Sequence, residues 1–224
     1  MTNSRDPRQH SARVTRLTLL ASQVAFACAS YSPHHAARLA PAGANETSVA
    51  ADVLLVDRGL GPELFAIPEF ALSRGLSQDW DAGGRVYPFG VELNARRRLL
   101  GYGAALVSVM PLVAVSQVSA TNADTSFVDV NAGALLLNGH RLTPTLELTL
   151  GLRSQLRLGL NAVAVREDFD AARWALLAGT SVALQWRLSP HTMLVPGVVV
   201  LCPYDLDRGV WDFPIVQGGA GVTW

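Results

Sequence analysis

The stretch TPTLELTLGLR, residues 143–153, decides the fold class of this chain. A leucine stands at every even position from Leu146 to Leu152, and the odd positions carry threonine, glutamate and glycine, followed by Arg153. A period of two residues is typical of a β-strand with one apolar and one polar face. The open question is whether the leucines face a protein core or a hydrocarbon solvent.

The same alternation recurs along the chain and predicts an all-β protein. One face of each segment is aliphatic or aromatic, whereas the other mixes charges with glycine and asparagine. Long and short connections alternate between the segments, as they do in outer-membrane barrels. The segment 142–165 is long for one bilayer crossing, so we predict ten strands and keep twelve as the alternative. The predicted strands are 47–56, 63–73, 78–88, 90–99, 102–115, 126–138, 142–165, 172–188, 191–202 and 213–224.

The composition agrees with a turn-rich β-protein. Of the 224 residues, 50% are hydrophobic and only 16% are charged, and nineteen glycines are spread along the chain. The eighteen basic residues are all arginine and are balanced by eighteen acidic residues, which gives a formal net charge of zero. A neutral chain gives no reason to expect nucleic acid as a partner.

The first residues predict export from the cytoplasm. Four arginines precede an uncharged run at 17–27, which is too short to span a bilayer and matches the pattern of a signal peptide. We therefore predict a signal peptide over 1–29, with an N-terminal extension as the alternative. Cys28 follows Ala25-Phe26-Ala27, so either lipidation at Cys28 or ordinary signal-peptidase cleavage fits the sequence.

The residues after the signal lack any periodicity. The segment 30–46 is polar and rich in proline and alanine, which predicts a flexible tether before a barrel domain at 47–224. His34 and His35 lie in this segment without a neighbouring cysteine or carboxylate, so we interpret them as solvated linker residues.

Three features favour a barrel that crosses a membrane over a soluble one. The chain carries an export signal, its polar face is rich in glycine and asparagine, and its last strand ends in Trp224 on the apolar face. A sheet exposed to lipid must close on itself, because open edges in hydrocarbon leave backbone groups unpaired. We therefore predict an antiparallel β-barrel in the bacterial outer membrane, with membrane lipid as a partner and the C-terminal strand as the contact for the barrel-assembly machinery.

The polar face carries the charged residues that we predict to point into the lumen. Arginines there could line an anion-selective pore, but a network of ion pairs that fills a narrow lumen is the favoured interpretation. The predicted lumen-facing residues are Arg85, Glu92, Arg96, Arg98, Asp129, Glu147, Arg153 and Arg157.

The N-terminal half resembles a group of uncharacterised bacterial outer-membrane barrels of lipoprotein type. The similarity runs from Cys28-Ala-Ser-Tyr through Ala37-Arg-Leu-Ala-Pro-Ala-Gly43 to the segment IPEFALSRGLSQDWDAG at 67–83. It covers Cys28 to about Leu100 and becomes generic beyond Gly101. The resemblance implies a barrel with lipidation at Cys28 and carries no agreed activity; Ala25 and Phe26 depart from the family's lipobox.

No residues in this sequence have the spacing of a catalytic site. His140 follows the hairpin signal Asn138-Gly139 and His191 follows Ser189-Pro190, so both are expected in short turns without a second catalytic group. The acidic segment 166–170 lacks the ligand order of a calcium loop. We expect no cofactor or metal and a non-enzymatic barrel, either structural or a narrow channel. The alternative is a lipid-anchored soluble periplasmic barrel that binds a hydrophobic ligand in an apolar lumen.

Overall fold

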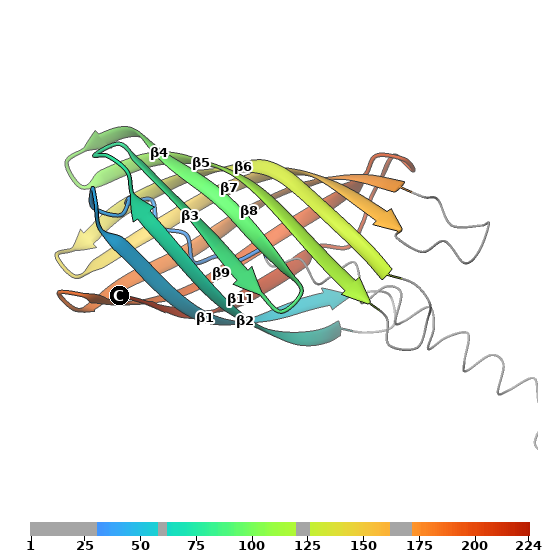
Figure 1. The fold of residues 1–224 in the computed structure, drawn as a ribbon, viewed down its shortest axis with the longest axis horizontal. Helices are drawn as coiled ribbons and strands as arrows, with labels where there is room; N and C mark the ends of the chain where they lie inside the picture. The colour runs from blue at the N-terminus through green and yellow to red at the C-terminus, as the bar shows by residue number, and fades with distance from the viewer. Residues whose placement is uncertain (1–30, 58–61, 120–125, 162–171) are drawn as a thin grey trace, which may run out of the picture.

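The chain forms a closed antiparallel barrel of ten long strands, as the alternation predicted (Figure 1). The computed structural model describes residues 31–57, 62–119, 126–161 and 172–224. Within these residues no helix has the length and apolar character needed to cross a membrane. The strands are β1 (Asn45–Asp57), β2 (Pro62–Gly75), β3 (Trp80–Tyr87), β4 (Gly90–Tyr102), β5 (Ala105–Ser119), β6 (Ser126–Thr143), β7 (Leu146–Asn161), β8 (Ala172–Ser189), β9 (Thr192–Asp205), β10 (Val210–Trp211) and β11 (Ile215–Thr223).

Neighbouring strands in the sequence pair with one another, and β11 pairs with β1 to close the ring. The short β10 pairs only with the end of β9, so it adds no strand to the barrel wall. In the wall, β9 pairs directly with β11. Closure leaves no open sheet edge along the wall, which is the condition for a sheet surrounded by hydrocarbon.

The two ends of the barrel differ in their connections. The connections 76–79, 103–104, 144–145 and 190–191 share one end with the C-terminus, and we call this the short-turn end. The opposite end, the long-loop end, carries the connections 58–61, 88–89, 120–125, 162–171 and 206–214. Of these, 58–61, 120–125 and 162–171 lie outside the described residues.

The predicted strand 142–165 is a single strand, β7, of sixteen residues. The alternative of twelve strands, with a turn at 153–155, is therefore wrong. Continuous pairing of β7 with both β6 and β8 explains why the side-chain alternation runs through this stretch without a break.

The turn that we predicted at Asn138-Gly139 is also wrong, because β6 continues to Thr143 and the turn lies at 144–145. A Cβ at Gly139 would lie 2.7 Å from Oε1 of Glu147 and 2.8 Å from the Cβ of Ala37. The glycine allows a close approach inside the barrel instead of a reversal of the chain. His140 consequently lies in a strand, whereas His191 is exposed in the turn 190–191, as predicted.

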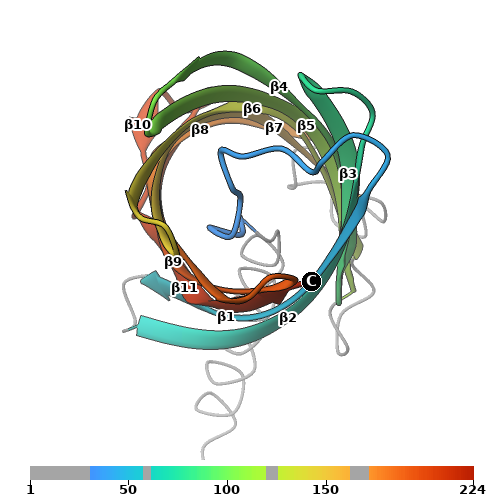
Figure 2. The same cartoon turned by 90° about the vertical axis from the view of Figure 1, so that its left-hand side faces the viewer.

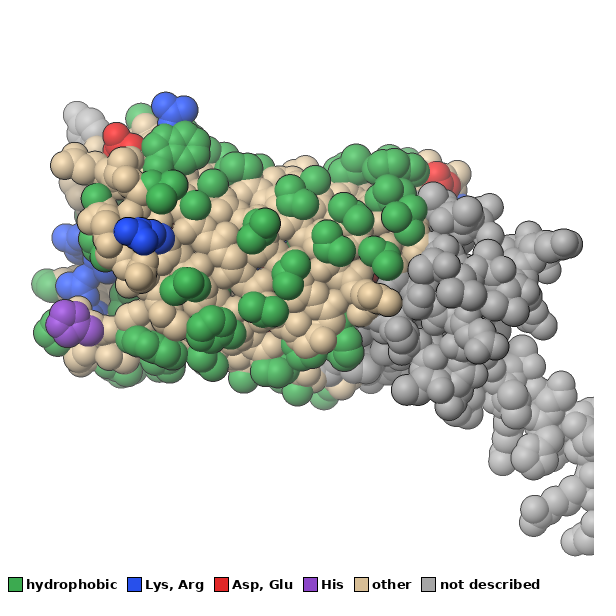
Figure 3. Space-filling model, in the orientation of Figure 1, with side chains coloured by type: hydrophobic (Ala, Val, Ile, Leu, Met, Phe, Trp, Pro, Cys, Tyr) green, Lys and Arg blue, Asp and Glu red, His purple; other side chains and the backbone are tan. Residues whose placement is uncertain are grey.

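Alternation directs the leucines of β7 outward and its polar side chains inward. Leu150 and Leu152 are 42% and 58% exposed, whereas Thr149 and Arg153 are 2% and 3% exposed. The outer face seen in Figure 3 carries hydrophobic side chains along its length and charged side chains near its ends. The buried interior of this molecule is thus its lumen, which holds charged and polar side chains together with two apolar clusters, and a second apolar surface faces out.

Candidate functional site: a lumen filled by the N-terminal segment

Residues 31–44 are here called the luminal segment; its residues up to Ala40 lie inside the barrel, and 41–43 are exposed where it leaves the lumen (Figure 2). The flexible tether predicted over 30–46 is therefore wrong for these residues. Tyr31 marks the deep end of the segment and is 1% exposed, and its backbone N–H donates to Oε1 of Gln217 at 2.9 Å. From there the segment runs to the short-turn end, where β1 begins at Asn45.

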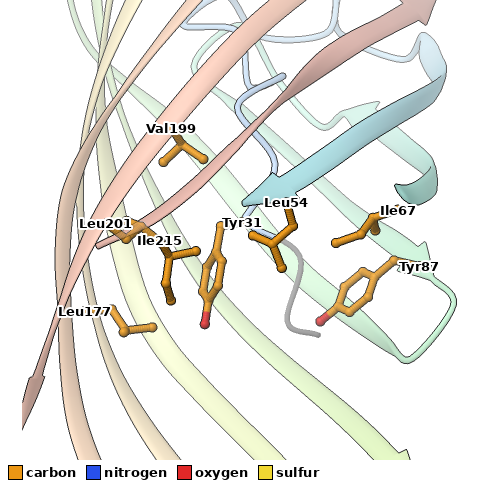
Figure 4. Packing of buried hydrophobic residues seen from close by; sticks show 8 residues of the cluster. All are labelled: Tyr31, Leu54, Ile67, Tyr87, Leu177, Val199, Leu201 and Ile215. Carbon is orange, nitrogen blue, oxygen red and sulfur yellow. The ribbon is translucent and has the colours of Figure 1, made fainter. Parts of the chain in front are cut away.

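An apolar cluster holds Tyr31 within the lumen (Figure 4). The other members come from six strands of the wall and are Leu54, Ile67, Tyr87, Leu177, Val199, Leu201 and Ile215. Figure 4 shows the Tyr31 ring standing among these side chains in the interior of the barrel. Burying an aromatic side chain of this size stabilises the folded state by roughly 1.5–3 kcal/mol, so the cluster anchors this end of the segment.

Wall side chains satisfy the backbone of the luminal segment, which has no strand or helix of its own. A buried peptide group without a partner costs free energy comparable to a lost hydrogen bond. Besides Gln217, four wall residues provide partners: Arg153 donates to the carbonyl of Ser32 at 3.2 Å, Arg96 donates to the carbonyl of Ala36, Ser108 donates to the carbonyl of Ala37 at 2.9 Å, and Asp81 accepts from the N–H of Ala40 at 2.9 Å.

The two histidines of the luminal segment are bound to wall residues, so their interpretation as solvated linker residues is wrong. Nε2 of His34 lies 2.6 Å from Oδ1 of Asp52, a carboxylate in β1 with a fully buried side chain. Nε2 of His35 lies 2.8 Å from Nη2 of Arg85. A guanidinium can only donate, so Nε2 of His35 accepts this hydrogen bond and the ring is neutral.

Arg85 is the centre of a buried charge network beneath the segment. Its Nη1 lies 3.1 Å from Oε2 of Glu69, and its Nη2 lies 2.5 Å from Oε1 of Glu92. All three side chains are at most 3% exposed. One guanidinium thus makes ion pairs with two carboxylates, one from each neighbouring strand, and it also holds His35.

Two further buried ion pairs extend the network along the wall. Arg96 binds Asp81 through both its Nε and its Nη2, and Nη2 of Arg157 lies 2.6 Å from Oδ2 of Asp129. Neighbouring strands supply the members of each pair: Asp81 is directly opposite Arg96, whereas Asp129 and Arg157 are diagonal neighbours on the same side of the wall. These pairs agree with the favoured interpretation of a lumen filled by ion pairs.

Six of the eight residues predicted to face the lumen are buried there, namely Arg85, Glu92, Arg96, Asp129, Arg153 and Arg157. Glu147 is half-buried near the short-turn end. Arg98 lies at the rim instead, where its Nε is 3.1 Å from Oδ1 of Asp79 and its side chain is 37% exposed. Trp224 points outward and is 52% exposed.

Sequence reasoning missed Asp52, Glu69 and Gln217. Asp52 interrupts an apolar run in β1, and Glu69 alternates with Pro68 and Phe70 in β2, so strand parity places both on the inner face. That parity was the available signal. What they bind could not be read from the strands alone, because their partners include a segment without periodicity.

Cavities border the luminal segment, and one of about 240 Å³ lies against Arg38, Leu39 and Ala40 near the short-turn end. A cavity of about 100 Å³ lies against His34, His35, Glu69, Asn94 and Arg96. It offers room for a few water molecules among polar groups. Across the described ranges, no three His, Cys, Asp or Glu side chains are grouped to hold a metal ion.

The end of the luminal segment passes so close to the wall that one position requires glycine. A Cβ on Gly75 would lie 2.1 Å from the carbonyl oxygen of Pro41. We expect Gly75→Ala to lower the free energy of unfolding by about 1–3 kcal/mol, because backbone must move to relieve the overlap. Urea unfolding of the refolded protein measures this, with Gly101→Ala as the control because a Cβ there meets nothing closer than 3.6 Å. Equal losses in both variants would contradict the close approach.

No family model and no curated protein matches this chain. Solved structures with a similar fold include Neisserial surface protein A, with 13% identity over 80% of this chain and 95% of that one and a TM-score of 0.44. The outer-membrane protease OmpT of Escherichia coli has 11% identity over 84% and 98%, with a TM-score of 0.49. The translocator domain of the autotransporter NalP of Neisseria meningitidis has 13% identity over 96% and 95%, with a TM-score of 0.43.

These similarities are too distant to support a shared activity. The fold of this chain rests on its own strand pairing, which closes an antiparallel ten-stranded ring. The lipoprotein-type subgroup suggested by the sequence stays a prediction, and Cys28 and the predicted signal peptide lie outside the described residues.

Proposed function

We propose that this chain spans the bacterial outer membrane as a non-enzymatic barrel whose lumen is closed at rest by its own luminal segment. The observation that carries the proposal is the inverted polarity of the barrel. Leucines and valines dominate the outer face, whereas ten charged side chains of the described wall are buried, nearly all of them within the lumen. In water this arrangement would expose most of the apolar surface, but in a bilayer that surface meets hydrocarbon.

Aromatic residues near both ends support a membrane position. Trp80, Trp186 and Trp224 are exposed close to the short-turn end, and Trp174 and Trp211 are exposed close to the long-loop end. Tryptophan concentrates at the two membrane–water interfaces, where its apolar ring and its N–H are both accommodated. The apolar band of the wall lies between these two sets.

The alternative of a soluble periplasmic barrel with a hydrophobic ligand loses its main argument. Such a protein needs an apolar lumen, but the lumen here holds Arg85, Glu69, Glu92 and the polar luminal segment. The buried leucines of the lumen instead pack in two clusters with Tyr31 and Ala37 of the luminal segment.

The surroundings of the histidines support a non-enzymatic role. His34 and His35 are held by Asp52 and Arg85 inside a filled lumen, and His191 is an exposed turn residue. General-base catalysis needs a histidine that can reach a nucleophile and a substrate together. A barrel that is structural, or a channel that conducts only after the luminal segment moves, fits this arrangement better.

Export and assembly complete the proposal. The signal peptide at 1–29 would direct the chain out of the cytoplasm, and β11 with the outward Trp224 would present the C-terminal strand to the barrel-assembly machinery. We also propose outer-membrane lipid as the direct environment of the wall.

The proposal is tested with a Cys28→Ala variant that keeps the signal peptide. We expect the protein in the outer-membrane fraction, with an unboiled band on SDS-PAGE that migrates differently from the boiled band. Recovery from the soluble periplasm without a heat-dependent shift would refute the membrane barrel, and loss of membrane association only in this variant would show that lipidation anchors the chain.

A charge on the outer wall provides a second test that depends on depth. We expect Leu152→Arg to lower the free energy of unfolding in phospholipid bilayers by about 2–4 kcal/mol, because Leu152 lies near the middle of β7 and faces outward. Leu142→Arg is the matched control, because Leu142 is 54% exposed but lies one residue from the end of β6, where the cost is about 0–1 kcal/mol. Urea titrations in vesicles measure both, and equal effects would argue against a hydrocarbon surrounding.

A further inference from the structure

Basic residues gather at the short-turn end of the barrel. Six arginines of the described chain lie there, namely Arg38, Arg74, Arg97, Arg98, Arg141 and Arg187. Of these six, only Arg98 makes an ion pair with another described residue, Asp79. Guanidinium groups without a carboxylate partner are available to an external anion.

Two of these arginines belong to the outer wall. Arg74 in β2 and Arg97 in β4 are exposed and share the outward parity of Leu72 and Leu93. They lie on either side of β3, because Arg74 pairs with Ala82 and Arg97 pairs with Trp80. Two strand spacings and the two-residue offset between Ala82 and Trp80 separate their backbones by roughly 12 Å, a gap that two long side chains can close on one phosphate group.

Trp80 contacts the guanidinium of Arg97, one of these two arginines. The Cζ of Arg97 lies 5.3 Å from the centroid of the Trp80 ring, which is within the range of a cation–π interaction. The ring itself is 39% exposed on the outer wall. A tryptophan at this height marks the boundary between headgroups and hydrocarbon, so the two guanidinium groups lie at the depth of lipid phosphates.

The wall on the hydrocarbon side of Arg74 and Arg97 is apolar. Leu72, Phe70, Val86, Leu93 and Val91 are all exposed there, by 45% or more of their surface. Cations above an apolar surface complement a molecule with an anionic head and hydrocarbon tails. Phosphate with acyl chains combines these features, and arginine binds phosphate oxygens in a bidentate manner.

We propose that Arg74 and Arg97, arranged around Trp80, form a binding site for the phosphate of an anionic phospholipid. The inference rests on the proposed function, because it requires the barrel to lie in a bilayer. The occupant is a glycerophospholipid of the leaflet at the short-turn end, with its acyl chains along the outward side chains of β2, β3 and β4.

The experiment measures how the full chain, reconstituted in phosphatidylcholine vesicles, selects between spin-labelled phosphatidylglycerol and spin-labelled phosphatidylcholine. Electron paramagnetic resonance separates the lipid that is immobilised at the wall from the free lipid. We expect the intact protein to prefer phosphatidylglycerol and Arg74→Gln/Arg97→Gln to lower this preference by roughly five- to 25-fold, at about fivefold per arginine. Arg74→Lys/Arg97→Lys should keep most of it, and 1 M salt should weaken it.

The matched control is Arg141→Gln/Arg187→Gln, which removes the same charge from the same end but on the inner parity of β6 and β8. It should leave the preference unchanged. Equal losses in the two double variants would overturn the site in favour of the general field of the basic end, and no loss in either would also overturn it. If Arg74→Gln/Arg97→Gln fails to show the heat-dependent shift, the two single variants take its place, each with an expected loss of about fivefold.

Two outcomes concern the occupant and the membrane itself. If lipopolysaccharide displaces phosphatidylglycerol from the intact protein at equal concentration, but not from the double variant, the site exists for a different lipid and the phospholipid assignment is wrong. If neither label shows an immobilised population, the barrel is not in the bilayer and the proposed function fails, whatever the two arginines bind.

Discussion

Replacing Arg85 by methionine is expected to lower the free energy of unfolding by about 3–5 kcal/mol. The substitution removes the guanidinium that pairs with both Glu69 and Glu92 and leaves these two carboxylates, each at most 3% exposed, without that cation. It also removes the hydrogen bond to His35 at 2.8 Å. Methionine fills a similar volume, so the loss reports charge rather than a cavity. Urea unfolding of protein refolded into phospholipid vesicles, followed by tryptophan fluorescence, provides the measurement.

Two variants separate this effect from a general effect of losing an arginine. Arg208→Met breaks ion pairs with Asp205 and Asp212, but the Arg208 side chain is 52% exposed, so the expected loss is below about 1 kcal/mol. The triple variant Arg85→Met/Glu69→Gln/Glu92→Gln should be more stable than Arg85→Met, because it removes the unpaired charges. If Arg85→Met costs no more than Arg208→Met, the lumen around Arg85 is hydrated and the network contributes little.

The barrel could be predicted because the alternation of polar and apolar residues lies within each strand's own sequence. The period of two in each strand predicts which side chains point into the lumen and which point outward. In β7 a single strand carries this pattern from Leu146 to Asn161. Alternation then predicts Arg85, Glu92, Arg96 and Arg157 on the inner face, and all four side chains are buried. Arg98 has the same parity but lies near the end of β4, where the wall meets solvent, so parity alone could not predict its exposure.

The luminal segment could not be predicted because its interactions are non-local. Tyr31 contacts Gln217 across 186 positions, and Ser32 contacts Arg153 across 121. Its backbone partners come from several strands, so neither a helical nor a strand period arises in its sequence. Gly139 is a related case: Asn138-Gly139 is a strong turn signal, but the residue is small because Ala37 and Glu147 approach it inside the barrel.

The buried charges of the wall also change what an open lumen would conduct. Counting arginines alone suggested anion selectivity. Beside the four buried arginines, however, the described wall carries five buried carboxylates in addition to Asp205, which pairs with Arg208 at the end of β9. Within the barrel these carboxylates are Asp52, Glu69, Asp81, Glu92 and Asp129. With the luminal segment gone, the lining would be weakly negative, and a weak preference for cations is expected.

Deleting residues 31–42 from the otherwise complete chain is therefore expected to convert a closed barrel into a cation-preferring pore. The deletion removes Tyr31 from its apolar cluster, and it removes His34, His35 and the backbone groups that Arg96, Ser108 and Arg153 bind. In planar bilayers the variant should show discrete conductance steps where the intact chain shows none. The reversal potential in a salt gradient should have the sign of cation selectivity.

A replacement of residues 31–42 by an equally long glycine–serine segment distinguishes specific closure from simple obstruction. Such a segment lacks the Tyr31 anchor and the partners of Asp52 and Arg85, so we expect it to leave the lumen and to give conductance close to that of the deletion. Folding of each variant is verified by the heat-dependent shift before recording. A folded deletion variant that stays silent would show that wall side chains such as Arg85, Glu92 and Arg157 close the lumen unaided, and the luminal segment would then stabilise the barrel without sealing it.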